Sequence, residues 1–170
     1  MVNEQENTLQ QEVDSFHKNS GEILRLALGI ESCLDFFISN YFCRPQTYKT
    51  FLFSDLILVG CLSFERKTQI FKEICEQEGI DKSTMKDISS AVNFVKNIRN
   101  MVAHGEAFMN GPEGLILQKR KSKTYKKDEL KITDDLVSKV DEKRLFSIRE
   151  INKILVNILG KNEKDRNNSF

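Results

Sequence analysis

Helix-breaking residues are scarce in this chain, and their scarcity constrains the fold more than any other feature. The 170 residues include only two prolines and eight glycines. Such long stretches without breakers favour long helices. Hydrophobic residues make up 39% of the chain and charged residues 30%, a composition typical of a globular domain and not of a disordered chain. We therefore expect one mainly helical domain over residues 1–160.

Charge, cysteine usage and hydropathy exclude several classes of protein. The formal net charge of +1 gives no indication that the protein as a whole binds a polyanion. The cysteines form no CxxC pair and no histidine lies at ligand spacing from them, so we expect no metal site and no cofactor. The chain opens on polar residues and has no apolar run of membrane-spanning length. We therefore expect a cytoplasmic protein that has no contact with a membrane.

Apolar residues recur at steps of three and four along most of the chain, which indicates amphipathic helices. Thr8 and Gln11 fit a capping box at the start of a first short helix, and residues 19–21 (Asn-Ser-Gly) predict a break after it. Ser63, Asp81 and Thr133 are suited to cap later helices. The expected helices cover residues 8–16, 22–42, 51–59, 63–78 and 82–104, a further helical region that begins after Thr133 with Asp134 and Asp135 in its first turn, and a final stripe over 145–158.

After the helix over 82–104 the pattern changes. Residues 104–114 are rich in turn formers and predict a loop, and two short apolar runs, 115–117 and 130–132, predict the strands of a hairpin. The hairpin spans about 114–132, and residues 161–170 predict a flexible tail. The fold class expected is all-α: an up-and-down bundle of four to five helices with a small β-hairpin inserted before the last helix.

The helix over 82–104 contains an anomaly, because Arg99 lies in the middle of its apolar arc. A buried guanidinium needs a carboxylate, a water-filled cleft or an anionic ligand. Glu31 is a candidate partner, since it lies within the apolar arc of the helix over 22–42, and Asp35 follows one turn later. The alternative interpretation is a structural salt bridge that fixes the register of the two helices.

His104 ends the same helix, just before Gly105. A histidine there is suited to acid–base chemistry near neutral pH, although it can also serve only to cap the helix. Asn100 lies one turn earlier on the same face and is placed to orient it. On a straight helix Arg99 and His104 point roughly 140° apart. They converge on one ligand only if the helix end frays or bends, or if two subunits meet there.

The segment Arg99-Asn100-Met101-Val102-Ala103-His104 resembles the Arg-x4–6-His signature of the HEPN superfamily, in the form that has Asn after Arg. The stretch over 30–38 resembles the helix that contributes an acidic residue beside that motif. The resemblance covers about residues 21–105. Many active members carry a tyrosine or a similar polar group shortly after the histidine, whereas this chain has Glu-Ala-Phe at 106–108.

The resemblance implies a bundle that forms a homodimer, with both Arg99–His104 motifs facing a shared cleft, and a metal-independent endoribonuclease activity. Arg99 would bind the scissile phosphate, and His104 would act as general acid or base in attack by the ribose 2′-hydroxyl. Asn100 would position His104 or the phosphate, and Glu31, with Asp35 beside it, would orient Arg99. It also implies a toxin or defence effector whose partner is an antitoxin protein.

Two alternatives to the nuclease remain open: a non-catalytic HEPN-type dimerisation module that binds RNA, a nucleotide or a protein, and a purely structural helical dimerisation domain. A basic run in the expected hairpin is suited to contact an RNA backbone, since phosphate binding is largely independent of sequence. The same run also fits a solvated hairpin tip. Its members of interest are Lys119, Arg120, Lys121 and Lys123.

Overall fold

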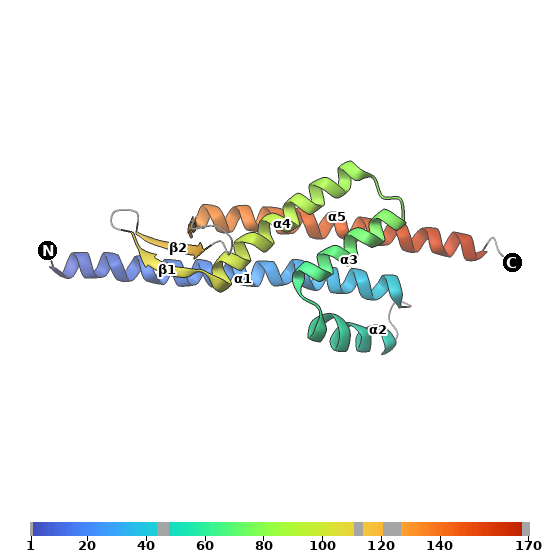
Figure 1. The fold of residues 1–170 in the computed structure, drawn as a ribbon, viewed down its shortest axis with the longest axis horizontal. Helices are drawn as coiled ribbons and strands as arrows, with labels where there is room; N and C mark the ends of the chain where they lie inside the picture. The colour runs from blue at the N-terminus through green and yellow to red at the C-terminus, as the bar shows by residue number, and fades with distance from the viewer. Residues whose placement is uncertain (1, 44–47, 111–113, 121–126, 168–170) are drawn as a thin grey trace. The chain divides into compact units, whose positions relative to one another are not determined.

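The structure is a computed structural model that describes residues 2–43, 48–110, 114–120 and 127–167. These residues form mostly helices, with a small antiparallel sheet before the last helix (Figure 1). This confirms the predicted fold class. The elements are α1 (Val2–Phe42), α2 (Tyr48–Phe53), the π-helix η1 (Ser54–Val59), α3 (Phe64–Gln77), α4 (Lys82–His104), β1 (Glu106–Met109), β2 (Leu115–Arg120), β3 (Lys127–Lys131) and α5 (Asp134–Asn167).

The chain forms two compact units. Unit 1 comprises Met1–Ala27 and Phe94–Glu142, and unit 2 comprises Leu28–Asn93 and Lys143–Phe170. Helices α1, α4 and α5 each contribute residues to both units. No helix in the described part of the chain is long and apolar enough to cross a membrane.

Unit 1 contains the sheet, whose strand order is β1-β2-β3 with antiparallel pairing throughout. In the register, Phe108 lies opposite Ile116, and Ile116 lies opposite Lys131. The sequence predicted only the last two strands, and β1 occupies a segment expected to be a loop. All four β1 residues are exposed. The strand therefore lacks the alternation of buried and exposed side chains that makes a strand recognisable in a sequence.

The core of unit 1 joins α1, α4, α5 and the sheet through buried aliphatic side chains. Gly114, the residue before β2, adopts a φ of +75°, a conformation that favours glycine. A Cβ at this position would lie 3.0 Å from Glu12 Oε2. The sheet therefore closely approaches the N-terminal part of α1. The buried residues are Ile23, Leu26, Ala27, Val95, Ile116, Leu117, Ile132 and Val140.

The predicted break at residues 19–21 is wrong, because α1 continues without interruption from Val2 to Phe42. The predicted capping box at Thr8 therefore lies inside the helix. Asn19 is buried, and its Nδ2 donates a hydrogen bond to Asp134 Oδ1 at 2.9 Å. Gly21 in a helix costs about 1 kcal/mol relative to alanine. Burial of Ile23 and the tertiary hydrogen bond of Asn19 offset that cost.

Unit 2 packs around a pair of phenylalanines, Phe37 of α1 and Phe71 of α3. Their ring centroids lie 4.9 Å apart in an edge-to-face arrangement, and both side chains are almost fully buried. The segment predicted as a helix over 51–59 is helical, and its second half is the π-helix η1. The other buried hydrophobic residues of unit 2 are Ile30, Cys33, Leu34, Ile38, Leu58, Phe64, Ile74, Cys75, Ile88, Ala91, Val92, Ile151, Ile154, Leu155 and Ile158.

Local capping sets the first residues of three helices, as predicted. The Ser63 side chain accepts from Arg66 N at 3.3 Å at the start of α3. Asp81 Oδ2 accepts from Thr84 N at 2.9 Å at the start of α4. Thr133 Oγ1 accepts from Leu136 N at 3.2 Å, and α5 then runs on to Asn167, which includes part of the segment expected to be a tail.

Candidate functional site

The C-terminal end of α4, in unit 1, carries the predicted motif. The helix remains regular through His104, since the Gly105 N–H donates to the Met101 carbonyl at 2.7 Å. The end of α4 therefore neither frays nor unwinds before His104. Arg99 and His104 consequently keep the angular separation of roughly 140° that five helical residues impose.

Arg99 and Asn100 contact one another directly. The half-buried Arg99 donates from Nη1 to Asn100 Oδ1 at 3.1 Å. Asn100 is a neutral partner, so this bond orients the guanidinium without compensating its charge. His104 is exposed at the end of the helix. The last one and a half turns of α4 thus carry two functional groups. One is the guanidinium of Arg99, which keeps N–H donors beyond the one bound to Asn100, and the other is the exposed imidazole of His104.

Gly105 connects α4 to β1 through a close backbone approach. A Cβ at this position would lie 2.5 Å from the Met101 carbonyl oxygen and 3.4 Å from Leu117 Cβ. The first of these atoms belongs to the helix backbone and cannot move aside like a flexible side chain. The chain can therefore pass from the end of α4 at His104 to the start of β1 at Glu106 in this conformation because residue 105 has no Cβ.

We expect Gly105→Ala to destabilise the protein by about 1–3 kcal/mol, because the added methyl group forces the backbone to shift. Urea unfolding followed by circular dichroism measures this change. Gly21→Ala is the matched control, since a Cβ at Gly21 meets nothing within 4 Å and alanine favours the helix by up to about 1 kcal/mol. Equal stability of the two variants would contradict the expectation.

The two predicted supporting carboxylates lie in unit 2, where both contact Lys67 of α3. Lys67 Nζ donates to Glu31 Oε1 at 3.1 Å and to Asp35 Oδ2 at 2.9 Å. Lys67 and Asp35 are both buried. Burial raises the pKa of the Asp35 carboxyl, and the hydrogen bond and charge of Lys67 oppose that rise.

Lys67 is a residue that the sequence analysis missed. It lies three residues after Phe64 and four before Phe71, so it occupies the same buried face of α3 as these two phenylalanines. A lysine at that spacing was the available signal that α3 carries a buried cation. Glu31 thus has a cationic partner of its own, and its predicted role in orienting Arg99 stays a prediction.

The basic run is described only in part. Lys119 lies half-buried in β2, and Arg120 ends that strand opposite Lys127 of β3. Lys121 and Lys123 lie outside the described residues. Their predicted contact with RNA therefore stays a prediction.

Within residues 2–43, 48–110, 114–120 and 127–167, no group of three or more His, Cys, Asp or Glu side chains is placed to hold a metal ion. Comparison with protein-family models, curated proteins and solved structures yields no match. The residues that bear on function in the described part of the chain are therefore those at the end of α4.

Proposed function

We propose that this protein is a HEPN-type, metal-independent endoribonuclease whose catalytic residues are Arg99, Asn100 and His104. The observation that carries the proposal is the arrangement at the end of α4, where Asn100 holds Arg99 and His104 stands exposed beside them. RNA is the proposed substrate, and a homodimer is the proposed active form. A role as toxin or defence effector, with an antitoxin protein as partner, belongs to the same proposal.

Arg99 is the group that binds the scissile phosphate. A guanidinium has five N–H donors in a planar fork, of which Asn100 engages one at Nη1. The remaining donors match the paired oxygens of a phosphodiester, and such bidentate, charge-assisted hydrogen bonds are the strong ones. Because Asn100 restricts the side chain, less rotational freedom is lost when the phosphate binds.

His104 is the group that moves protons. As general base it removes the proton from the ribose 2′-hydroxyl, and the 2′-oxygen attacks the adjacent phosphorus. The bond from phosphorus to the 5′-oxygen breaks, and that oxygen takes a proton from a protonated imidazole. The products are a 2′,3′-cyclic phosphate and a 5′-hydroxyl, so the reaction consumes no water in this step.

The intact end of α4 supports pairing of two chains. Arg99 and His104 diverge by roughly 140° on one regular helix, so a single α4 does not direct both side chains at one phosphodiester. Two copies whose α4 ends meet place two arginines and two histidines around one cleft. One histidine then serves as base and the other as acid.

The test is cleavage of a labelled RNA in EDTA by the wild type, Arg99→Ala and His104→Ala. We expect each variant to lose about a hundredfold in rate, which is the lower range for loss of a general acid or base. His17→Ala, which removes the other histidine, is the control and retains full activity. The product ends are identified by their resistance to phosphatase until the cyclic phosphate is opened.

Equal cleavage by all four proteins would show that the activity comes from another site or a contaminant. Absence of cleavage by a folded, dimeric wild type would favour the second candidate, a non-catalytic binding module. One observation favours that candidate: β1 lies at an edge of the sheet, and its Phe108 and Met109 are exposed. Exposed edge strands bind other chains readily. Sedimentation equilibrium reports the oligomeric state on which both candidates depend.

A further inference from the structure

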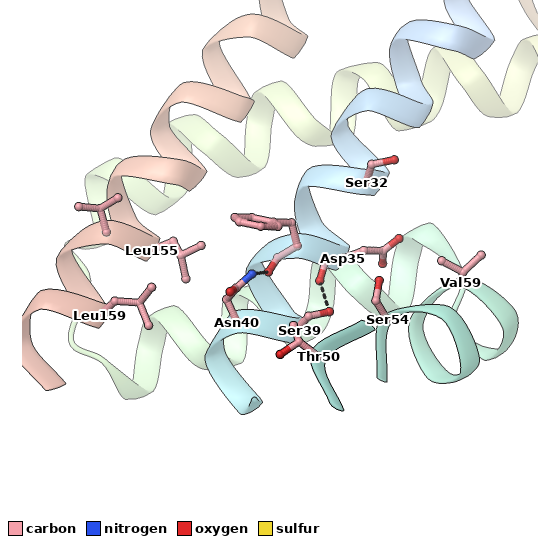
Figure 2. A pocket seen from close by; sticks show the side chains of 11 residues that line it. Ser32, Asp35, Ser39, Asn40, Thr50, Ser54, Val59, Leu155 and Leu159 are labelled. Atoms are coloured by element: carbon pink, nitrogen blue, oxygen red, sulfur yellow. Dashed lines mark hydrogen bonds between the residues drawn. The ribbon is translucent and has the colours of Figure 1, made fainter. Parts of the chain in front are cut away.

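Unit 2 contains a cavity of about 550 Å³ whose walls come from α1, α2, η1 and the C-terminal part of α5 (Figure 2). Three of its polar residues are already engaged. Asp35 forms an ion pair with Lys67, and the side chains of Ser39 and Asn40 donate to carbonyls of α1 at 2.7 Å each. These three residues therefore define no ligand for the cavity. The open edge of the sheet in unit 1 is more specific, because its charges, register and backbone groups define what fits there.

The two edges of the sheet differ in charge. Strand β3 forms one edge, and four of its five residues are charged: Lys127, Asp128, Glu129 and Lys131. Strand β1 forms the other edge and has one charged residue, Glu106, among four exposed residues. Charged side chains and prolines are the usual means by which an edge strand avoids pairing with another chain. β3 is protected in this way, whereas β1 is suited to accept a further strand.

The pairing of β1 with β2 determines which backbone groups of β1 face outward. Asn110 continues the register of the strand, and its N–H donates to the Gly114 carbonyl at 2.9 Å. In an antiparallel pair, residues that exchange hydrogen bonds alternate with residues whose N–H and C=O groups point the other way. The even-numbered residues of β1 therefore bond to β2. The N–H and C=O groups of Ala107 and Met109 face the open edge.

A second copy of β1 fits this edge in a register that the backbone defines. Cross-strand neighbours share a face of the sheet and side chains alternate between faces, so a two-fold axis must place one residue opposite itself. With Phe108 at the axis, Ala107 and Met109 of opposite copies exchange hydrogen bonds in both directions. With Ala107 at the axis, Met109 would face Gly105, whose N–H already donates to the Met101 carbonyl. With Met109 at the axis, Ala107 would face a residue beyond the end of β1.

The side chains are compatible with the register centred on Phe108. This residue is 42% exposed and meets its own copy at a position without backbone hydrogen bonds, where cross-strand side chains come closest and aromatic pairs are favourable. The long side chain of Met109 meets the small one of Ala107. Glu106 lies opposite Asn110, so the single charged residue of β1 does not face its own copy.

We propose that β1 joins two copies of this chain edge to edge, with Phe108 opposite Phe108, in one continuous antiparallel sheet. His104 precedes the residue on the axis by four positions, so the two α4 ends lie about 27 Å apart along the strand direction. This contact is therefore separate from the meeting of α4 ends in the proposed nuclease, and it goes beyond that function.

The test is sedimentation equilibrium of the full chain for the wild type, Phe108→Lys, Phe108→Glu and an equal mixture of the two variants, with folding checked by circular dichroism. We expect each variant alone to have at most half the mass of the wild type at the same concentration, because like charges meet at the axis. The mixture regains the wild-type mass, because lysine then faces glutamate. Glu129→Lys changes an exposed charge on the opposite edge strand and leaves the mass unchanged.

A second pair of variants tests the backbone hydrogen bonds. Met109→Pro removes the outward N–H of that residue and leaves the bonds from β1 to β2 in place, since an edge strand tolerates proline where the N–H faces outward. We expect it to lower the mass as the Phe108 variants do. Met109→Thr, which changes the same side chain but keeps the N–H, retains the wild-type mass.

A monomeric wild type, an unchanged mass for Phe108→Lys, or a mixture that stays at the mass of the single variants would each overturn the proposal. An unchanged mass would also leave β1 open to a different protein chain. If the copies meet at their α4 ends as well, Phe108→Lys reduces a larger assembly to a dimer, and otherwise it reduces a dimer to a monomer. Because both outcomes support the β1 contact and neither involves RNA, failure of one proposal leaves the other standing.

Discussion

Lys67→Met is expected to destabilise the protein by about 3–5 kcal/mol, the usual cost of removing one partner from a buried ion pair. Lys67 is 2% exposed and donates to Glu31 and Asp35. Without it, two carboxylates stay close together with no cation between them. Urea unfolding followed by circular dichroism gives the free energy of unfolding. Since most domains are stable by only 5–15 kcal/mol, the loss is a large share of the total.

The penalty of Lys67→Met is expected to depend on pH. Burial raises the pKa of Asp35 above its ordinary value, while the hydrogen bond and charge of Lys67 lower it. Removing Lys67 therefore raises this pKa further. A carboxyl whose pKa is higher in the folded state favours folding at low pH, and this contribution is lost as pH rises through that pKa. The penalty should shrink as pH falls from neutral towards the ordinary range of aspartate.

Two control variants separate the ion-pair effect from a general loss of charge. Arg66→Met removes an exposed cation from the same helix and is expected to change stability by no more than about 0.5 kcal/mol. The double variant Lys67→Met/Asp35→Asn removes one of the two carboxylate charges and should recover part of the lost stability. A penalty for Lys67→Met that matches the Arg66→Met control, or that is constant with pH, would contradict this account.

Phe37→Ala is the second change for which we expect a loss of about 3–5 kcal/mol, the usual cost of truncating a buried phenylalanine. The Phe37 ring is fully buried and packs edge-to-face on Phe71. The cavity left between α1 and α3 has rigid walls on both helices, so it cannot collapse fully. The same unfolding measurement, supported by the melting temperature, determines the loss.

Phe36 provides the matched control, because it is the preceding residue of α1 and is 58% exposed. Phe36→Ala should change stability by no more than about 0.5 kcal/mol. In the double variant Phe37→Ala/Phe71→Ala, the losses should fall short of additivity by about 0.5–1.5 kcal/mol, the coupling of an aromatic pair. Similar effects of Phe36→Ala and Phe37→Ala would contradict the placement of the core.

Local sequence signals were enough to predict the helical class, the starts of α3, α4 and α5, and the position of the motif on α4. The caps at Ser63, Asp81 and Thr133 act within three residues, so their signals are local and readable. The same holds for Arg99, Asn100 and His104, which share one helix end. Helical geometry alone fixes how those three residues are spaced around the axis.

The continuity of α1, the formation of β1 and the partner of the buried carboxylates depend on long-range packing. Asn19 lies inside α1 and donates to Asp134, which lies 115 residues later in the chain, a partner that no local pattern indicates. Strand β1 forms by pairing with β2 and leaves all its side chains exposed, so it has no pattern of its own. Lys67 meets Glu31 across 36 residues. These long-range hydrogen-bond and ion-pair partners come together only when whole helices pack against one another. Local helix propensity does not predict that packing.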